Sequence, residues 1–173
     1  NVVALLPGTS APDEYVFYTA HWDHLGRCQK AADGDDICNG AVDNATGTAA
    51  LVALAEANVK AGPTARSQVF LAVTAEESGL LGAQYYAANP VYPMEKTVAN
   101  LALDILQTAG AANDVVLVGK GQASLEDDMA RIARAQGRTV TPESLPERGL
   151  FYRADHFSFA KRGVPVMLLM GIA

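Results

Sequence analysis

Short apolar runs alternate with amphipathic stretches along the whole sequence. An apolar run that stops at a turn residue or a charged residue is typical of a buried β-strand. Apolar residues that recur every three or four positions predict a helix. The predicted strands are Val2–Leu6, Tyr15–Ala20, Val69–Val73, Val98–Leu106, Val115–Val118 and Val164–Met170. The predicted helices are Thr46 to Gly62, Gly79 to Ala88, Ser124 to Gln136, and a short one near His156 to Arg162. This alternation predicts one α/β domain, a sandwich around a mixed, largely parallel sheet.

The composition is that of a folded domain. The chain has 173 residues, of which 50% are hydrophobic and 18% are charged, so it can bury a sizeable core. The formal net charge of -6 argues against nucleic acid or an anionic membrane surface as a partner. No apolar run approaches the roughly 20 residues that span a bilayer, so we expect no membrane segment in this chain.

Two cysteines, Cys28 and Cys38, lie in a stretch rich in Gly, Asp and Asn, a composition that is typical of an exposed loop. They could close this loop as a disulfide, or they could be two free thiols. A disulfide would suit a periplasmic or secreted protein, whose signal peptide is not in this chain. The pair is a poor zinc-finger candidate, because the close Cys or His pairs of such sites are absent.

Imidazoles and carboxylates follow several of the predicted strands. In open α/β sheets the functional crevice lies beyond the carboxyl ends of the strands. A ligand set without a usable thiolate suits zinc, and less well manganese or cobalt. The residues in question are His21, Asp23, His24, Asp43, Glu76, Glu77, Asp104, Asp155 and His156.

Most of these residues have a structural alternative when each is considered alone. His21 could be a core histidine, Asp43-Asn44 could cap the next helix, and Glu76-Glu77 could begin one. Asp104 is different, because a carboxylate within the apolar run LALDIL is costly unless it is paired or binds a metal. The joint occurrence of these residues at strand ends favours a metal site.

Five segments resemble the co-catalytic dizinc exopeptidases. They are AHWDHLG (20–26), NGAVDNATG (39–47), VTAEESGLLG (73–82), LALD (101–104) and RADHFSFAKRGVPV (153–166). This family includes bacterial leucine-type aminopeptidases, with glutamate carboxypeptidases, glutaminyl cyclases and the transferrin receptor ectodomain as relatives. The resemblance implies a three-layer α/β/α fold. It also implies that the chain is a catalytic core truncated at both ends relative to the family.

The resemblance also assigns roles to individual residues. It implies two zinc ions, one bound by His21 and Asp104, the other by Glu77 and His156, with Asp43 bridging both. Asp23 would orient the His21 imidazole, Glu76 would be the general base, and the Asp43-Asn44 peptide bond would be cis. His24 matches no ligand role, and the alternatives are that it lines the cleft wall with Trp22 or that its role is purely structural.

The implied function is that of an aminopeptidase. Such an enzyme hydrolyses the N-terminal peptide bond of peptides with a free N-terminus, through a metal-bridging water. The alternatives are a carboxypeptidase or glutaminyl cyclase of the same family, or a non-catalytic receptor-like domain. The cyclases work with one zinc, so a complete second ligand set argues for peptide hydrolysis. The preferred N-terminal residue and the oligomeric state are not predicted.

Overall fold

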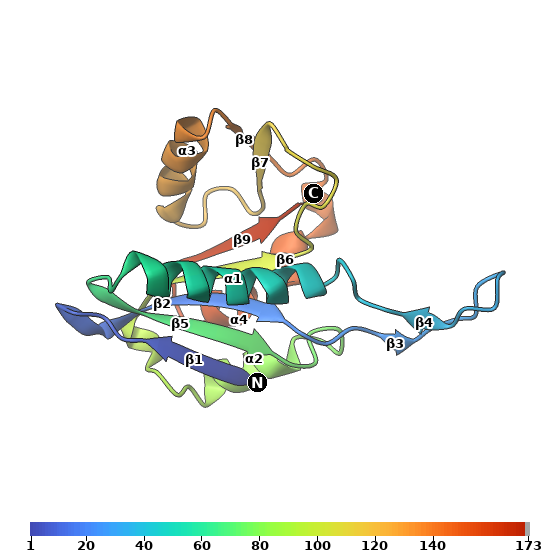
Figure 1. The fold of residues 1–173 in the computed structure, drawn as a ribbon, viewed down its shortest axis with the longest axis horizontal. Coiled ribbons are helices and arrows are strands. Elements are labelled where there is room, and N and C mark those ends of the chain that lie inside the picture. The colour runs from blue at the N-terminus through green and yellow to red at the C-terminus, as the bar shows by residue number, and fades with distance from the viewer. Residues whose placement is uncertain (172–173) are drawn as a thin grey trace.

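The computed structural model describes residues 1–171, and its centre is a five-stranded sheet with strand order β1-β5-β2-β6-β9 (Figure 1). Strand β1 is antiparallel to β5, and the other neighbours are parallel. The sheet is therefore mixed and largely parallel, as the sequence predicts. Its strands are β1 (Val2–Leu6), β2 (Ala11–His21), β5 (Arg66–Val73), β6 (Thr97–Asp104) and β9 (Val166–Met170).

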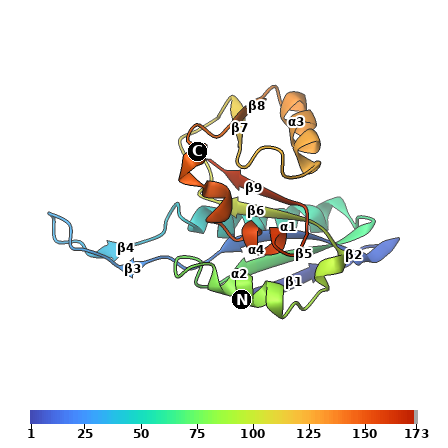
Figure 2. The same cartoon turned by 180° about the vertical axis from the view of Figure 1, so that it is seen from behind.

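Helices cover both faces of this sheet. Helix α1 (Ala45–Ala61) packs on one face through a cluster that includes Leu51 and the strand residue Leu103. Helices α2 (Leu81–Ala88) and α4 (His156–Ala160) lie on the other face, which Figure 2 shows from behind. Their cluster is the larger one and includes Phe17 and Phe159, both fully buried. The expected three-layer α/β/α arrangement is confirmed.

A smaller lobe lies beside β9. It consists of β7 (Asp114–Leu117), α3 (Leu125–Ala135) and β8 (Thr139–Pro142), with β7 parallel to β8. The lobe packs on the main sheet through Leu117, Met129 and Met167. Strand β8 lies where the sequence predicts no strand, and it forms because pairing with β7 satisfies its backbone. Three short 3-10 turns complete the chain: Met94–Lys96, Pro146–Arg148 and Leu150–Tyr152.

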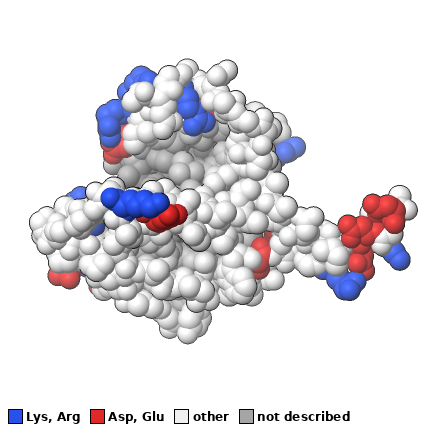
Figure 3. Space-filling model, in the orientation of Figure 1, with Lys and Arg blue, Asp and Glu red and all other residues white. Residues whose placement is uncertain are grey.

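An arm projects from the sheet edge between β2 and α1 (Figure 1). It contains the short antiparallel pair β3 (Gly26–Arg27) and β4 (Ile37–Cys38), closed by a disulfide between Cys28 and Cys38. Figure 3 shows charged side chains gathered at its outer end. Of the two alternatives that the sequence leaves open for the cysteines, the structure has the disulfide.

Two predicted element boundaries shift because of local backbone conformation. The strand predicted to reach Leu106 ends at Asp104, since Ile105 has a φ of 45° in the left-handed region. The helix predicted from Gly79 begins at Leu81, since Leu80 has a φ of 62°. Among residues 1–171, no helix has the length and apolar character to cross a bilayer.

Candidate metal centre

The residues singled out from the sequence meet at one edge of the sheet. His21 and Asp104 are the last residues of the parallel strands β2 and β6. Glu76 and Glu77 follow β5, which lies on the other side of β2 from β6. Asp43 lies just before α1. Parallel strands present their carboxyl ends at the same edge, so a topology of this kind brings side chains distant in sequence together.

The first group of close ligand atoms contains His21, Asp43 and Asp104. The His21 Nε2 atom lies 3.2 Å from Asp43 Oδ1 and 3.4 Å from Asp104 Oδ1. His21 is 1% exposed and Asp104 is 7% exposed. Burial lowers the pKa of the His21 imidazole, but the hydrogen bond and charge of Asp104, together with the charges of Glu76 and Asp155, outweigh this effect and raise the pKa to about 9. Burial raises the pKa of Asp43, and the charges of Asp104 and Glu77 add to that rise.

Asn44 fixes the start of α1 against the end of β6. Its Oδ1 accepts hydrogen bonds from the backbone N–H groups of Gly47 and Ile105, and its Nδ2 donates to the carbonyl of Leu103. The Asp43-Asn44 peptide bond is cis, as predicted. Since Asn44 provides the helix cap, the Asp43 carboxylate is not needed for capping and can face His21.

The second group contains His24, Asp43 and Glu77, so Asp43 is shared by both groups. His24 Nδ1 lies 2.6 Å from Glu77 Oε1. No pattern in the sequence predicts this contact, since the expected roles of His24 were to line the cleft or to be purely structural. The available signal was its position, since it follows Asp23 by one residue in the segment that leaves β2.

We predicted that the Asp23 carboxylate orients the His21 imidazole, but in the structure the backbone carbonyl of Asp23 lies closer to the ring. The His21 ring Nδ1 lies 3.1 Å from the backbone carbonyl of Asp23, whereas the Asp23 carboxylate is 3.8 Å away. That carboxylate instead accepts hydrogen bonds from the backbone N–H groups of Glu76 and Glu77, at 3.1 and 3.3 Å. The Asp23 side chain therefore holds the turn that carries both glutamates.

Glu76 lies beside both groups and forms a third one with His21 and Glu77. Burial raises the pKa of Glu76 to about 7, and nearby carboxylates contribute to the rise while His21 opposes it. Ala75, the preceding residue, has a φ of 55° in the left-handed region, which is uncommon for a residue with a Cβ atom. Strained backbone of this kind is concentrated at functional sites.

His156, the remaining predicted ligand, lies at the start of α4. None of the ligand groups among residues 1–171 includes it. Its ring is fully buried, packs edge-on against Phe151 with 4.9 Å between ring centroids, and makes no hydrogen bond to a described residue. Burial lowers its pKa to about 4. The ring is enclosed at the start of α4, because Phe151 of the preceding turn covers it.

Asp155, next to His156, is also deeply buried, at 3% exposure. Burial raises its pKa well above the usual value, and the charge of Glu76 is the next cause. Asp155 thus places a second buried carboxyl close to Glu76.

The orphaned polar atoms of the two groups fit a metal ion. Within residues 1–171, buried atoms of four of these side chains have no hydrogen-bond partner: His24 Nδ1, Asp43 Oδ1, Glu77 Oε1 and Asp104 Oδ1. Buried polar atoms are normally satisfied. Imidazole nitrogens and carboxylate oxygens are the donor types that zinc takes, and manganese or cobalt also accept them. The residues present therefore fit divalent cations.

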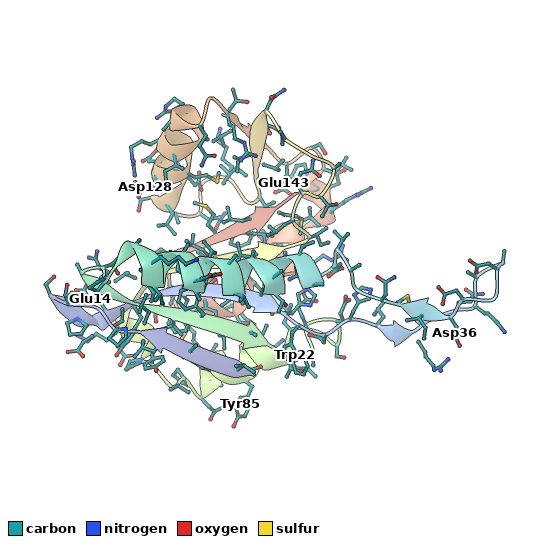
Figure 4. The ribbon with its side chains drawn as sticks, viewed as in Figure 1. Glu14, Trp22, Asp36, Tyr85, Asp128 and Glu143 are labelled. Carbon is teal, nitrogen blue, oxygen red and sulfur yellow. A yellow bond between two sulfur atoms is a disulfide. The ribbon has the colours of Figure 1, made fainter. Side chains whose placement is uncertain are left out.

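A cleft of about 590 Å³ opens beside this cluster. Its wall includes Trp22, His24, Gly40, Asn44 and Thr48, so it runs between the segment that leaves β2 and the first turns of α1. Trp22 is 59% exposed, and Figure 4 labels it near the base of the arm. Of the residues in the ligand groups, His24 is the one that lines this cleft.

Comparisons with known proteins point to one family. A model of peptidase family M28 matches residues 1–173. A protein of Pyrenophora teres named probable zinc metalloprotease is 36% identical over 111 residues, which cover 64% of this chain and 23% of that protein. A second protein of this name, from Leptosphaeria maculans, is 34% identical over 139 residues, covering 79% and 29%. The chain thus matches less than a third of the length of these relatives.

Solved structures share the fold. The zinc aminopeptidase of Bacillus subtilis matches with a TM-score of 0.72 at 20% identity, covering 97% of this chain and 39% of that protein. The aminopeptidase of Aneurinibacillus sp. strain AM-1 matches with a TM-score of 0.70 at 24% identity, covering 98% and 38%. The glutaminyl cyclase of Porphyromonas gingivalis matches with a TM-score of 0.75 at 20% identity, covering 98% and 62%.

Proposed function

Because the chain belongs to peptidase family M28, we propose that it is the catalytic core of a zinc-dependent aminopeptidase that acts on peptides with a free N-terminus. The observation that carries the proposal is the sharing of Asp43 between two groups of ligand atoms. One shared carboxylate between two such groups suits a pair of ions.

The proposed ligands of the first ion are His21, Asp43 and Asp104, and Asp43 and Glu77 contribute to the second. His156 is the remaining proposed ligand of the second ion, and its two buried ring nitrogens have no hydrogen-bond partner among the described residues. Zinc bound at these residues supplies Lewis acidity towards the peptide carbonyl and towards water. Manganese or cobalt could replace zinc, since the same ligand types bind them.

Glu76 is the proposed general base. With a pKa raised to about 7, its carboxylate can take a proton from the attacking water near neutral pH and pass it to the leaving amine. The Asp23 carboxylate keeps the backbone of Glu76 and Glu77 in place, so one glutamate can serve the proton transfer while its neighbour serves the metal. No covalent link between the enzyme and the substrate is required.

A periplasmic or secreted location is part of the proposal. The disulfide between Cys28 and Cys38 supports it, because such bonds persist in oxidising compartments.

Glutaminyl cyclisation is the second candidate, since a glutaminyl cyclase shares the fold. A carboxypeptidase of the family and a receptor-like domain without catalysis are further alternatives. The cyclase alternative predicts one zinc per chain, whereas the aminopeptidase proposal predicts two.

The test is metal content per chain together with hydrolysis of leucine- and alanine-p-nitroanilide, before and after zinc is added. We expect two zinc ions and release of p-nitroaniline, with no hydrolysis of a peptide whose N-terminus is acetylated. One zinc with conversion of glutaminyl peptides would favour the cyclase. Two ions without turnover of any of these substrates would favour a binding domain, and the absence of bound metal would refute the ligand assignment.

A further inference from the structure

We propose that the cleft between the arm and α1 binds the part of a peptide that follows the scissile bond, and that Trp22 and Val52 pack against an apolar side chain there. This inference rests on the proposed aminopeptidase function and deepens it, because it assigns a substrate-binding surface outside the metal centre. The substrates it favours are peptides whose second or third residue is apolar, rather than amides of a single amino acid.

The inner end of the cleft borders the metal centre. Its wall includes Asp23, His24 and Asn44. The Asp23 carboxylate holds the turn after β5, His24 belongs to the second ligand group, and Asn44 follows Asp43 directly in the chain. A peptide whose scissile bond lies at the ions therefore has this cleft next to it on one side.

The outer part of the cleft is apolar and exposed. Trp22, from the segment that leaves β2, is 59% exposed, and Val52, from α1, is 66% exposed. Val52 lies on the same helix face as Ala45 and Ala49, which also line the cleft, because the three residues recur at helical spacing. Covering this surface removes apolar area from water, and exposed apolar patches commonly mark binding sites for that reason.

The distribution of charge favours an apolar occupant. Among the described residues that line the cleft, Asp23 and His24 are the ionisable ones, and both lie at its inner end. The charged side chains of the arm gather instead at its outer end (Figure 3). A charged side chain bound between Trp22 and Val52 would lose hydration without gaining a partner, so an apolar side chain fits better.

The wall on the arm side is fixed before any peptide binds. Gly26 pairs with Cys38 across β3 and β4, and Cys38 is bonded to Cys28. A Cβ atom placed on Gly26 would meet no atom of a non-neighbouring residue within 4 Å, so the cleft is open at this point. A preformed wall lowers the ordering cost of binding an extended peptide.

The open shape of the cleft suits the leaving part of the substrate. The first residue of an aminopeptidase substrate ends at its own amino group and needs space for one side chain. The rest of the peptide has no fixed length, so it requires a path that continues into solvent. The cleft has a volume of about 590 Å³, within the range of sites that hold small ligands, and its outer end is exposed at Trp22 and Val52.

The first experiment compares two substrates of the zinc-loaded protein, leucinamide and the peptide Leu-Phe-Ala-Ala. The cleft variants are Trp22→Ala and Val52→Ser. Tyr85→Ala is the matched control, because Tyr85 is an aromatic residue of α2 that is 67% exposed and lies on the other face of the sheet. Zinc content and Tm confirm that each variant is loaded and folded.

The readout is the ratio of kcat/KM for the peptide to kcat/KM for leucinamide. We expect this ratio to fall about 10-fold in each cleft variant, as the loss of one buried apolar contact predicts. The ratio in Tyr85→Ala should equal that of the unaltered protein.

The second experiment measures binding without turnover and uses Trp22 as the reporter, since it is the single tryptophan of the chain. Zinc-loaded Glu76→Gln is mixed with Leu-Ala-Ala-Ala peptides in which 4-nitrophenylalanine, a contact quencher of indole fluorescence, replaces the first or the third residue. We expect stronger quenching at saturation from the third position than from the first. A Trp22→Phe version of the same variant gives the background signal.

Three outcomes would overturn the inference: the same substrate ratio in the cleft variants as in the unaltered protein, no quenching by either peptide, or stronger quenching from the first position. Trp22 fluorescence that changes with protein concentration but not with peptide would assign the cleft to a second copy of the chain, and would also overturn it. In each case, hydrolysis of leucinamide by the unaltered protein would still support the proposed function. If the unaltered protein hydrolyses neither substrate, the proposed function fails, and the quenching experiment alone decides the inference.

Discussion

The carboxylate of Asp23 accepts a hydrogen bond from the backbone N–H of Glu76 at 3.1 Å, although the two residues are 53 positions apart. A second bond, to the N–H of Glu77, uses the other carboxylate oxygen. One side chain at the end of β2 thus fixes the turn after β5. The proposed general base and a proposed metal ligand both depend on this turn.

Replacing Asp23 by Ala should therefore impair both functions of the turn. Second-sphere groups of this kind typically contribute 10- to 100-fold, so we expect a loss of about that size in kcat and in zinc affinity. Steady-state kinetics and zinc titration measure the two effects. Asp23→Asn, which keeps one acceptor oxygen, should lose less, and equal behaviour of the two variants would contradict the assigned hydrogen bonds.

Replacing Glu76 by Gln should separate proton transfer from metal binding. The amide cannot take a proton from water, so turnover should fall by about 10² to 10⁴-fold, the usual contribution of a general base. Zinc content should stay unchanged, because Glu76 is not a proposed ligand. Glu77→Gln is the matched control, and it should lose zinc affinity as well as turnover. Equal loss of metal in both variants would argue against the role of Glu76.

Removing the metal should destabilise the fold. Without a cation, the carboxylates of Asp43, Glu77 and Asp104 repel one another at close range, and several of their buried oxygens lack partners. Chelation should lower Tm, and added zinc should restore it. At 100 times the dissociation constant, binding at one site contributes about 2.7 kcal/mol to the free energy of unfolding. Scanning calorimetry over a range of zinc concentrations checks this, and a Tm independent of zinc would contradict the metal centre.

The contribution of His156 to the stability of the metal-free protein should fall as the pH drops below about 6.5. His156 has a pKa of about 4 in the folded state, because burial disfavours its charged form, against an ordinary value of 6.5. Between these values the unfolded chain binds a proton that the folded chain does not. This one group should therefore lower the free energy of unfolding by up to about 3 kcal/mol between pH 6.5 and pH 4, a contribution that comparison with a variant isolates.

The control for this effect is His156→Leu, whose side chain does not titrate. Its stability should depend less on pH over the same range, and denaturant unfolding at several pH values measures the difference between the two proteins. Asp155 and Glu76 act in the opposite direction, because their raised pKa values make the folded state retain protons as the pH rises. That contribution is present in both proteins. Parallel pH profiles would show that His156 is not held neutral by burial.

Much of the fold follows from local pattern. The apolar run at Val2–Leu6 coincides with β1, but the prediction that this strand is buried is wrong, because β1 lies at the sheet edge and is largely exposed. The run at Val69–Val73 is the buried part of β5, because a strand covered on both faces needs continuous apolar residues. Strand β8 was not predicted, since it exists through its pairing with β7 rather than through a pattern of its own. The boundaries at Ile105 and Leu80 depend on backbone conformations that their residue types do not signal.

The candidate site also has features that the sequence predicts and features that it does not. The sequence by itself determined which residues could carry the chemistry, because His21, Asp104 and the Glu76-Glu77 pair lie at or just after strand ends, and a parallel sheet gathers those ends at one edge. Only the tertiary structure decided which atoms meet. It turned the Asp23 carboxylate towards the backbone of Glu76, placed His24 against Glu77 and enclosed His156 beneath Phe151. The physical reason is that side-chain direction and contacts between distant segments depend on how the elements pack, and the order of residues along the chain does not specify that packing.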